Sequence, residues 1–140
     1  EVVPPVAGRP GVADAADRWL LRGDRQLDRT AFSQLAYQTD TMTFEIDVGW
    51  VAAGGYDPVE AIDSLGDRLS LVHLADVRQT RGFPPAFRSV PPGEGLIDPD
   101  EILAAVDRSN ADWVIFEDDD PDDPEAAIWK GIATLCGRPV

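Results

Sequence analysis

The sequence predicts an α/β protein built on a parallel sheet. Three short β-rich runs, at residues 42–48, 69–74 and 113–116, alternate with segments that carry helical spacing or helix-start signals. Such alternation indicates right-handed crossovers, which make successive strands parallel. The 140 residues fit one domain, and 44% hydrophobic residues are enough for a core. We expect an irregular N-terminal segment over residues 1–26 and the βα domain over residues 27–140.

The first predicted helix covers residues 27–38, where Leu27, Ala31 and Leu35 recur at steps of four. The first strand follows at residues 42–48, because its sequence alternates and is rich in β-forming residues. These two elements begin the alternation on which the predicted fold rests.

Asp-Pro pairs mark the starts of the next helices. The pairs at residues 57–58 and 98–99 supply an N-cap followed by a proline at the first helical position. The first of these helices is expected to end at Gly66, and a last helix is predicted over residues 125–135. The last helix is expected to bury Ala126, Trp129, Ile132 and Ala133.

Residues 76–95 lie between the second strand and the helix that begins at residue 98. This stretch contains four prolines and three glycines, and we expect it to be a long irregular loop. Long loops inside compact domains are usually functional or disordered, so this loop is a candidate for part of a site.

Charge and cysteine content exclude several classes of protein. With 12 basic and 26 acidic residues, the net charge of −14 disfavours nucleic acid and anionic membranes as partners. The single cysteine excludes an internal disulfide framework, and no apolar run approaches the roughly 20 residues that span a bilayer. Residues 1–10 lack the pattern of a signal peptide. We expect a cytoplasmic protein that binds neither nucleic acid nor membrane.

One polar residue stands at or near the end of each predicted strand: Asp47, His73 and Glu117. The carboxyl ends of parallel strands meet at one edge of a sheet, so these side chains are expected to converge. A carboxylate buried alone is costly, which favours pairing or a bound metal. One imidazole nitrogen with carboxylate oxygens suits Mn, Mg, Co, Fe or Zn.

Each of these residues also has a simpler explanation. A single strand histidine is commonly a hydrogen-bonded core group, and Asp47 could cap a turn at Gly49. Glu117 could belong to a solvated acidic surface with residues 118–120. The residues taken singly leave both interpretations open.

Five motifs then carry a resemblance. They are FEIDVGWV at 44–51, GGYDP at 54–58, LVHLAD at 71–76, GEGLID at 93–98 and WVIFEDD at 113–119. In this order the chain resembles the sugar phosphate isomerase/epimerase family, also called xylose-isomerase-like TIM barrels, from about residue 27 to about residue 135. The resemblance implies a partial (β/α)8 TIM barrel with about the last three to four βα units, because a whole barrel needs about 250 residues.

The resemblance also implies a chemistry. Its members isomerise or epimerise sugars and sugar phosphates, or dehydrate inosose-type polyols, through an enediolate held by a divalent metal. It implies Mn, Mg or Co as the metal, with Zn as a further candidate, and Asp47, His73 and Glu117 as three of four ligands. Glu117 and Asp47 would also move the proton as acid and base. Substrate contacts are implied for Trp50, Asp76 and Glu94.

Departures from the family pattern support an alternative. Ala75 stands where the family commonly has a lysine, and the fourth ligand has no clear counterpart, although Asp14 and Asp17 are candidates. A half barrel also leaves strand edges and one sheet face uncovered. The alternative is a non-catalytic binding or regulatory remnant that pairs with a second copy or a complementary half-barrel. A DNA-repair endonuclease of the same superfamily is a third candidate, against which the single histidine and the charge of −14 argue.

Overall fold

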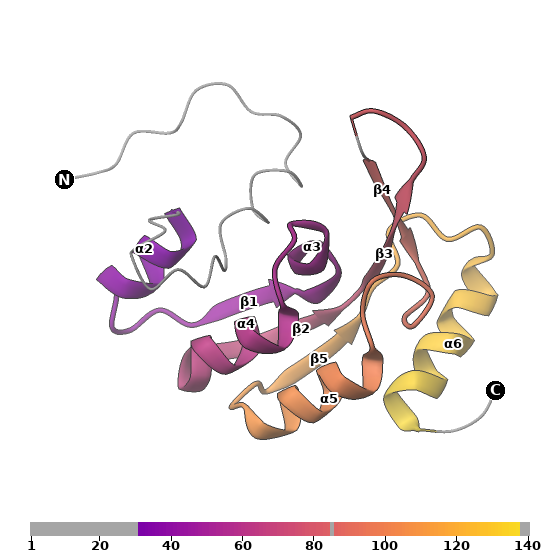
Figure 1. Cartoon of the computed structure of the whole chain (residues 1–140). Coiled ribbons are helices and arrows are strands. Elements are labelled where there is room, and N and C mark those ends of the chain that lie inside the picture. The colour runs from indigo at the N-terminus through magenta and orange to yellow at the C-terminus, as the bar shows by residue number, and fades with distance from the viewer. Residues whose placement is uncertain (1–30, 85, 138–140) are drawn as a thin grey trace.

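The computed structural model describes residues 31–84 and 86–137 and centres on a parallel sheet (Figure 1). Its strands are β1 (Phe44–Asp47), β2 (Leu69–Leu74) and β5 (Trp113–Phe116), in the order β1-β2-β5. All three predicted strands are therefore confirmed. Across the described residues neither β1 nor β5 pairs with a further strand, so the sheet is not closed and the fold is a partial barrel.

The helices are α2 (Ala31–Gln38), α3 (Val48–Ala53), α4 (Pro58–Leu65), the short 3-10 helix η2 (Gly66–Arg68), α5 (Pro99–Arg108) and α6 (Pro124–Cys136). Four of the helices were predicted from the sequence, whereas α3 and η2 were not. The side chains of Asp57, Asp98 and Asp123 cap α4, α5 and α6, and each accepts from the backbone amides of the two residues that follow the first-turn proline. Both predicted Asp-Pro helix starts are confirmed, and the same pair opens α6. None of the described helices is long and apolar enough to cross a membrane.

The two faces of the sheet have different surroundings. Ile46, Val72 and Leu74 are buried in one core with residues of α4 and α5, which lie together along one side of the sheet (Figure 1). Side chains alternate along a strand, so the neighbouring positions point to the opposite face. There Trp113 is 68% exposed and Ile115 44% exposed. Within the described residues this second face is uncovered, as expected for a partial barrel.

Register places the polar candidates on this uncovered face. Asp47 pairs with His73 across β1 and β2, and His73 pairs with Ile115 across β2 and β5. Partners in register share a face of the sheet. Glu45, two residues before Asp47, shares that face as well.

The expectation of an irregular loop over residues 76–95 is wrong. The chain forms an antiparallel hairpin of β3 (Asp76–Thr80) and β4 (Ala86–Val90), which extends beyond the carboxyl end of β2 (Figure 1). Pro84, Pro91 and Pro92, the prolines of this stretch that the structure describes, stand outside these two strands. Prolines there remove no amide from the hairpin ladder, so they do not prevent strand pairing.

The buried face predicted for α6 is also wrong. Ala127 and Gly131 are the buried residues of this helix, whereas Trp129 is 55% exposed and Ile132 is exposed as well. A Cβ atom at Gly131 would lie 2.5 Å from Cγ of Phe116, so the helix passes directly over that ring. The close approach needs small residues and turns the large apolar side chains of α6 outward.

Candidate metal centre

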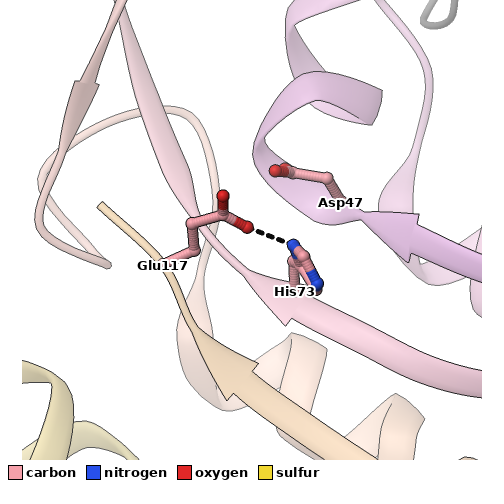
Figure 2. Close-up of side chains that lie close together, drawn as sticks. All are labelled: Asp47, His73 and Glu117. Atoms are coloured by element: carbon pink, nitrogen blue, oxygen red, sulfur yellow. Dashed lines mark ion pairs between the residues drawn. The ribbon is translucent and has the colours of Figure 1, made fainter. Parts of the chain in front are cut away.

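Three elements bring the predicted residues to one place. Asp47 is the last residue of β1, His73 lies one residue before the end of β2, and Glu117 directly follows β5. The Glu117 amide donates to the Leu74 carbonyl at 3.3 Å, which holds the chain beside β2 after β5 ends. One ligand-type atom from each of the three side chains lies within 4.8 Å of the others (Figure 2). The structure thus brings together the three residues that the sequence singled out.

Asp47 is held by the helix that follows it. The strand passes straight into α3, and Oδ1 of Asp47 accepts a hydrogen bond from the Trp50 amide at 3.0 Å as the N-cap. At Gly49 a Cβ atom would lie 2.9 Å from the Ala75 carbonyl oxygen, so α3 packs tightly on the end of β2. The simpler role considered for Asp47, capping the next turn, is therefore present beside its place in the cluster.

Electrostatics sets Asp47 apart from an ordinary surface acid. Burial raises the pKa of Asp47 to about 6, although the hydrogen bond from the Trp50 amide acts in the opposite direction and lowers it. The negative charge of Glu117 raises the Asp47 pKa further, and His73 lowers it. A carboxylate with such a pKa changes its charge close to neutral pH, in the range where general acids and bases work.

Glu117 contacts the imidazole directly. Its Oε2 forms an ion pair with Nδ1 of His73, drawn as the dashed line in Figure 2. The same oxygen is buried and has no hydrogen bond of regular geometry to any described residue. A buried carboxylate oxygen in this position is stabilised by a nearby positive charge.

The donor set fits a divalent cation. It offers one imidazole nitrogen and two carboxylate groups, which suits Mn, Co, Zn and Mg to different degrees. Catalytic metal sites commonly use three protein ligands and leave positions for water or substrate. Asp47, His73 and Glu117 are the residues that would hold the ion.

Trp50 and Glu94, two predicted substrate contacts, lie outside the cluster of ligand atoms. Trp50 is half-buried in the first turn of α3, and its amide joins it to Asp47. Glu94 is exposed and forms ion pairs with Lys130 and, at 3.7 Å, with Arg78. The hydrogen bond and charge of Lys130 hold the pKa of Glu94 below its usual value. Contact between either residue and a substrate stays a prediction.

Asp76, the third predicted substrate contact, has a structural task. Its residue is fully buried, and its carboxylate accepts hydrogen bonds from backbone amides at 2.7–3.2 Å. The donors are Val77, Gly93, Gly95, Leu96 and Ile97. The amides enclose this carboxylate and give Asp76 a structural role, and contact between Asp76 and a substrate stays a prediction.

Sequence reasoning missed Glu45. Its Oε1 lies 3.3 Å from Nε2 of His73, on the side of the ring away from Glu117. Its position two residues before Asp47 on the same strand is the signal that could have found it, because alternate residues share a face.

Comparison with known proteins agrees with this geometry. Residues 34–136 match the model of the family described as xylose isomerase-like TIM barrel. The chain belongs to this family. An inosose dehydratase of Geobacillus kaustophilus (strain HTA426) is 36% identical over 84 residues, which cover 51% of this chain and 27% of that relative. The chain thus spans about a quarter of that relative's length, and the predicted xylose isomerase-like family is confirmed.

Proposed function

We propose that this chain is the metal-binding part of an isomerase, epimerase or dehydratase that acts on a sugar, sugar phosphate or polyol. The observation that carries the proposal is the convergence of Asp47, His73 and Glu117 within 4.8 Å. They stand on the uncovered face of the sheet at its carboxyl edge, where active sites of such barrels are found. Likeness to a protein named inosose dehydratase supports a polyol-type substrate.

The proposed role of each residue follows from its position in the cluster. A divalent cation, when bound, would supply a Lewis acid for a substrate carbonyl or hydroxyl oxygen. Glu117, with its side chain 35% exposed, can reach a substrate, and we assign it proton transfer. Asp47, with a pKa of about 6, is the second acid–base group. Trp50, at the start of α3, would border the substrate.

A non-catalytic binding module that pairs with a second copy or a complementary half-barrel is the second candidate. The observation that favours it is the uncovered sheet face, with Trp113 and Ile115 exposed. Apolar patches of this kind mark interaction surfaces. Light scattering that finds a dimer, together with no turnover, would favour this candidate over the enzyme.

Metal titration tests the proposal. Protein stripped of metal is titrated calorimetrically with Mn²⁺, Co²⁺, Mg²⁺ and Zn²⁺, and one ion per chain is expected. His73→Ala should weaken binding at least about 100-fold, because it removes the nitrogen ligand. The matched control, Gln79→Ala on the exposed side of β3, should leave binding unchanged.

Isotope exchange then separates an enzyme from a binding module. The metal-loaded chain is incubated in D₂O with ketoses and inososes, and loss of the substrate C–H signal is followed by NMR. Deuterium uptake that disappears in Glu117→Gln supports acid–base catalysis. No metal binding by folded wild-type protein would overturn the proposal, and binding without deuterium uptake would favour the non-catalytic candidate.

A further inference from the structure

His73 lies between two glutamates that belong to different strands. Nδ1 forms an ion pair with Glu117 Oε2 after β5, and Nε2 lies 3.3 Å from Glu45 Oε1 on β1. The two contacts use the two different nitrogens of one imidazole. Figure 2 shows one ring nitrogen directed at Glu117, with Asp47 near it, and the other nitrogen turned away.

Glu45 stands outside the group of possible ligands. The three atoms within 4.8 Å of one another come from Asp47, His73 and Glu117 and include none from Glu45. Its carboxylate meets the ring at the nitrogen opposite to the one that faces Glu117. Asp47, Glu117 and Nδ1 of His73 would hold the ion, and Glu45 contacts the ring at its other nitrogen.

We infer that Glu45 is a positioning residue that keeps the proton of His73 on Nε2 and directs Nδ1 to the metal. This inference rests on the proposed function, since it concerns a ligand of the proposed metal centre. In a neutral imidazole one nitrogen donates and the other accepts, so a ring that gives up the Nδ1 proton facing Glu117 to bind the ion keeps its remaining proton on Nε2, where Glu45 is the nearby acceptor. Metal-ligating histidines commonly donate their second N–H to a carboxylate, which fixes the ring and raises its basicity.

The surroundings of Glu45 favour this role over that of a chance surface charge. Its neighbours in register on the same face are Leu71 and Trp113, neither of which is charged. Its ion-pair contact among the described residues is the one to His73. With its side chain 58% exposed, it can be replaced without opening a cavity in the core.

The experiment measures Zn²⁺ binding to the full chain after chelation. Glu45→Ala removes the acceptor and should weaken Zn²⁺ binding about 10- to 100-fold, the range found for partners that orient ligands. Glu45→Gln keeps a carbonyl oxygen that can accept from Nε2–H, so most of the affinity should return. Glu101→Gln removes one exposed carboxylate from α5 and should leave affinity unchanged.

NMR supplies a readout that a merely structural role would not move. His73 is the only histidine of the chain, so the ring-nitrogen signals of ¹⁵N-labelled protein belong to it alone. Zn²⁺-loaded wild-type protein should show metal on Nδ1 and a proton on Nε2. Glu45→Ala should show a mixture of the two ring forms, and Glu45→Gln should restore the single form.

The outcomes separate this inference from the function on which it rests. Zn²⁺ binding that is equally tight in wild type and Glu45→Ala, or a spectrum with metal on Nε2, overturns the role of Glu45 and leaves the metal centre standing. No Zn²⁺ binding by folded wild-type protein overturns the metal centre itself. Circular dichroism of each variant establishes that it is folded before its affinity is compared.

Discussion

Asp76 and Asp47 both bring a carboxylate into the carboxyl edge of the sheet, but their surroundings differ. Five backbone amides donate to Asp76, which is fully buried. Asp47 accepts from the Trp50 amide, with a weaker contribution from the Gly49 amide, and faces His73 and Glu117. A carboxylate enclosed by amides is part of the scaffold, whereas one set beside another acid and an imidazole is available to a ligand.

Glycines make the environment of Asp76 possible. Gly93 has a φ of 84°, a conformation that side chains disfavour, and its amide reaches Oδ2 of Asp76 at 3.0 Å. At Gly95 a Cβ atom would lie 2.3 Å from the Val77 carbonyl oxygen. The Gly-Glu-Gly turn thus folds around the Asp76 carboxylate and leaves Glu94 at the surface, beside Lys130.

The largest loss of stability is expected for Asp76→Ala. Each buried amide left without a partner costs about 1–3 kcal/mol. The amides of Val77 and Ile97 are buried and the other three donors are part-buried, so the free energy of unfolding should fall by about 4 kcal/mol. Urea denaturation followed by circular dichroism measures this change. Asp100→Ala, at an exposed position on α5, is the control, and Asp76→Asn serves if the alanine variant does not fold. A loss below about 1 kcal/mol would contradict the scaffold role of Asp76.

The next effect concerns the turn itself. Gly95→Ala places a methyl group against backbone atoms of β3, which cannot rotate away, and should cost about 2–3 kcal/mol in unfolding free energy. Gly55→Ala is the matched control. Gly55 has a φ of 82° but open space around it, so that change should cost about 1 kcal/mol from backbone strain alone. Equal losses of unfolding free energy in the two variants would contradict the claim that a methyl group at Gly95 clashes with β3.

Asp47→Asn should stabilise the metal-free protein. The pKa of Asp47 is raised from 3.8 to about 6 in the folded protein. The stabilising contribution of the protonated carboxyl to the free energy of unfolding is therefore complete below pH 3.8 and is lost as the pH rises through about 6. Asparagine keeps the N-cap and removes the charge, so the free energy of unfolding should rise by about 1–2 kcal/mol at pH 7.5. The gain should shrink towards pH 5 in urea titrations, and metal binding should be lost.

A matched variant sharpens this result. Asp57→Asn changes another aspartate N-cap, but one whose residue is exposed, so it removes no burial penalty. A gain for Asp47→Asn that is the same at pH 5 and pH 7.5 would contradict the assignment of the effect to charge.

The smallest effect is expected at the exposed ion pair of Glu94. Lys130→Met should lower the free energy of unfolding by less than about 1 kcal/mol at pH 7, because solvent screens surface pairs. Lys130 lowers the pKa of Glu94 in the folded protein. The stabilisation from this ion pair is therefore present at pH values above the ordinary pKa of a glutamate and is lost as the pH falls through the lowered pKa of Glu94. Thermal unfolding at pH 7 and pH 3 measures it, and a difference that persists at pH 3 would point to packing of the lysine stem.

The sequence by itself determined the local features. Strands at residues 69–74 and 113–116 and the Asp-Pro helix starts were predictable, because apolar runs and caps act within a few residues. One polar residue near each strand end then predicted that Asp47, His73 and Glu117 would meet. Parallel strands share a carboxyl edge, which is why so simple a rule reached that cluster.

Tertiary structure decided the roles that depend on distant contacts. The enclosure of Asp76 requires the hairpin to bring residues 93–97 back to it, and the buried face of α6 depends on the fit of Gly131 over Phe116. The meeting of Glu45 with His73 depends on the register between β1 and β2. In each case the deciding contact joins residues that are far apart in the chain, so no local pattern of side chains specifies it.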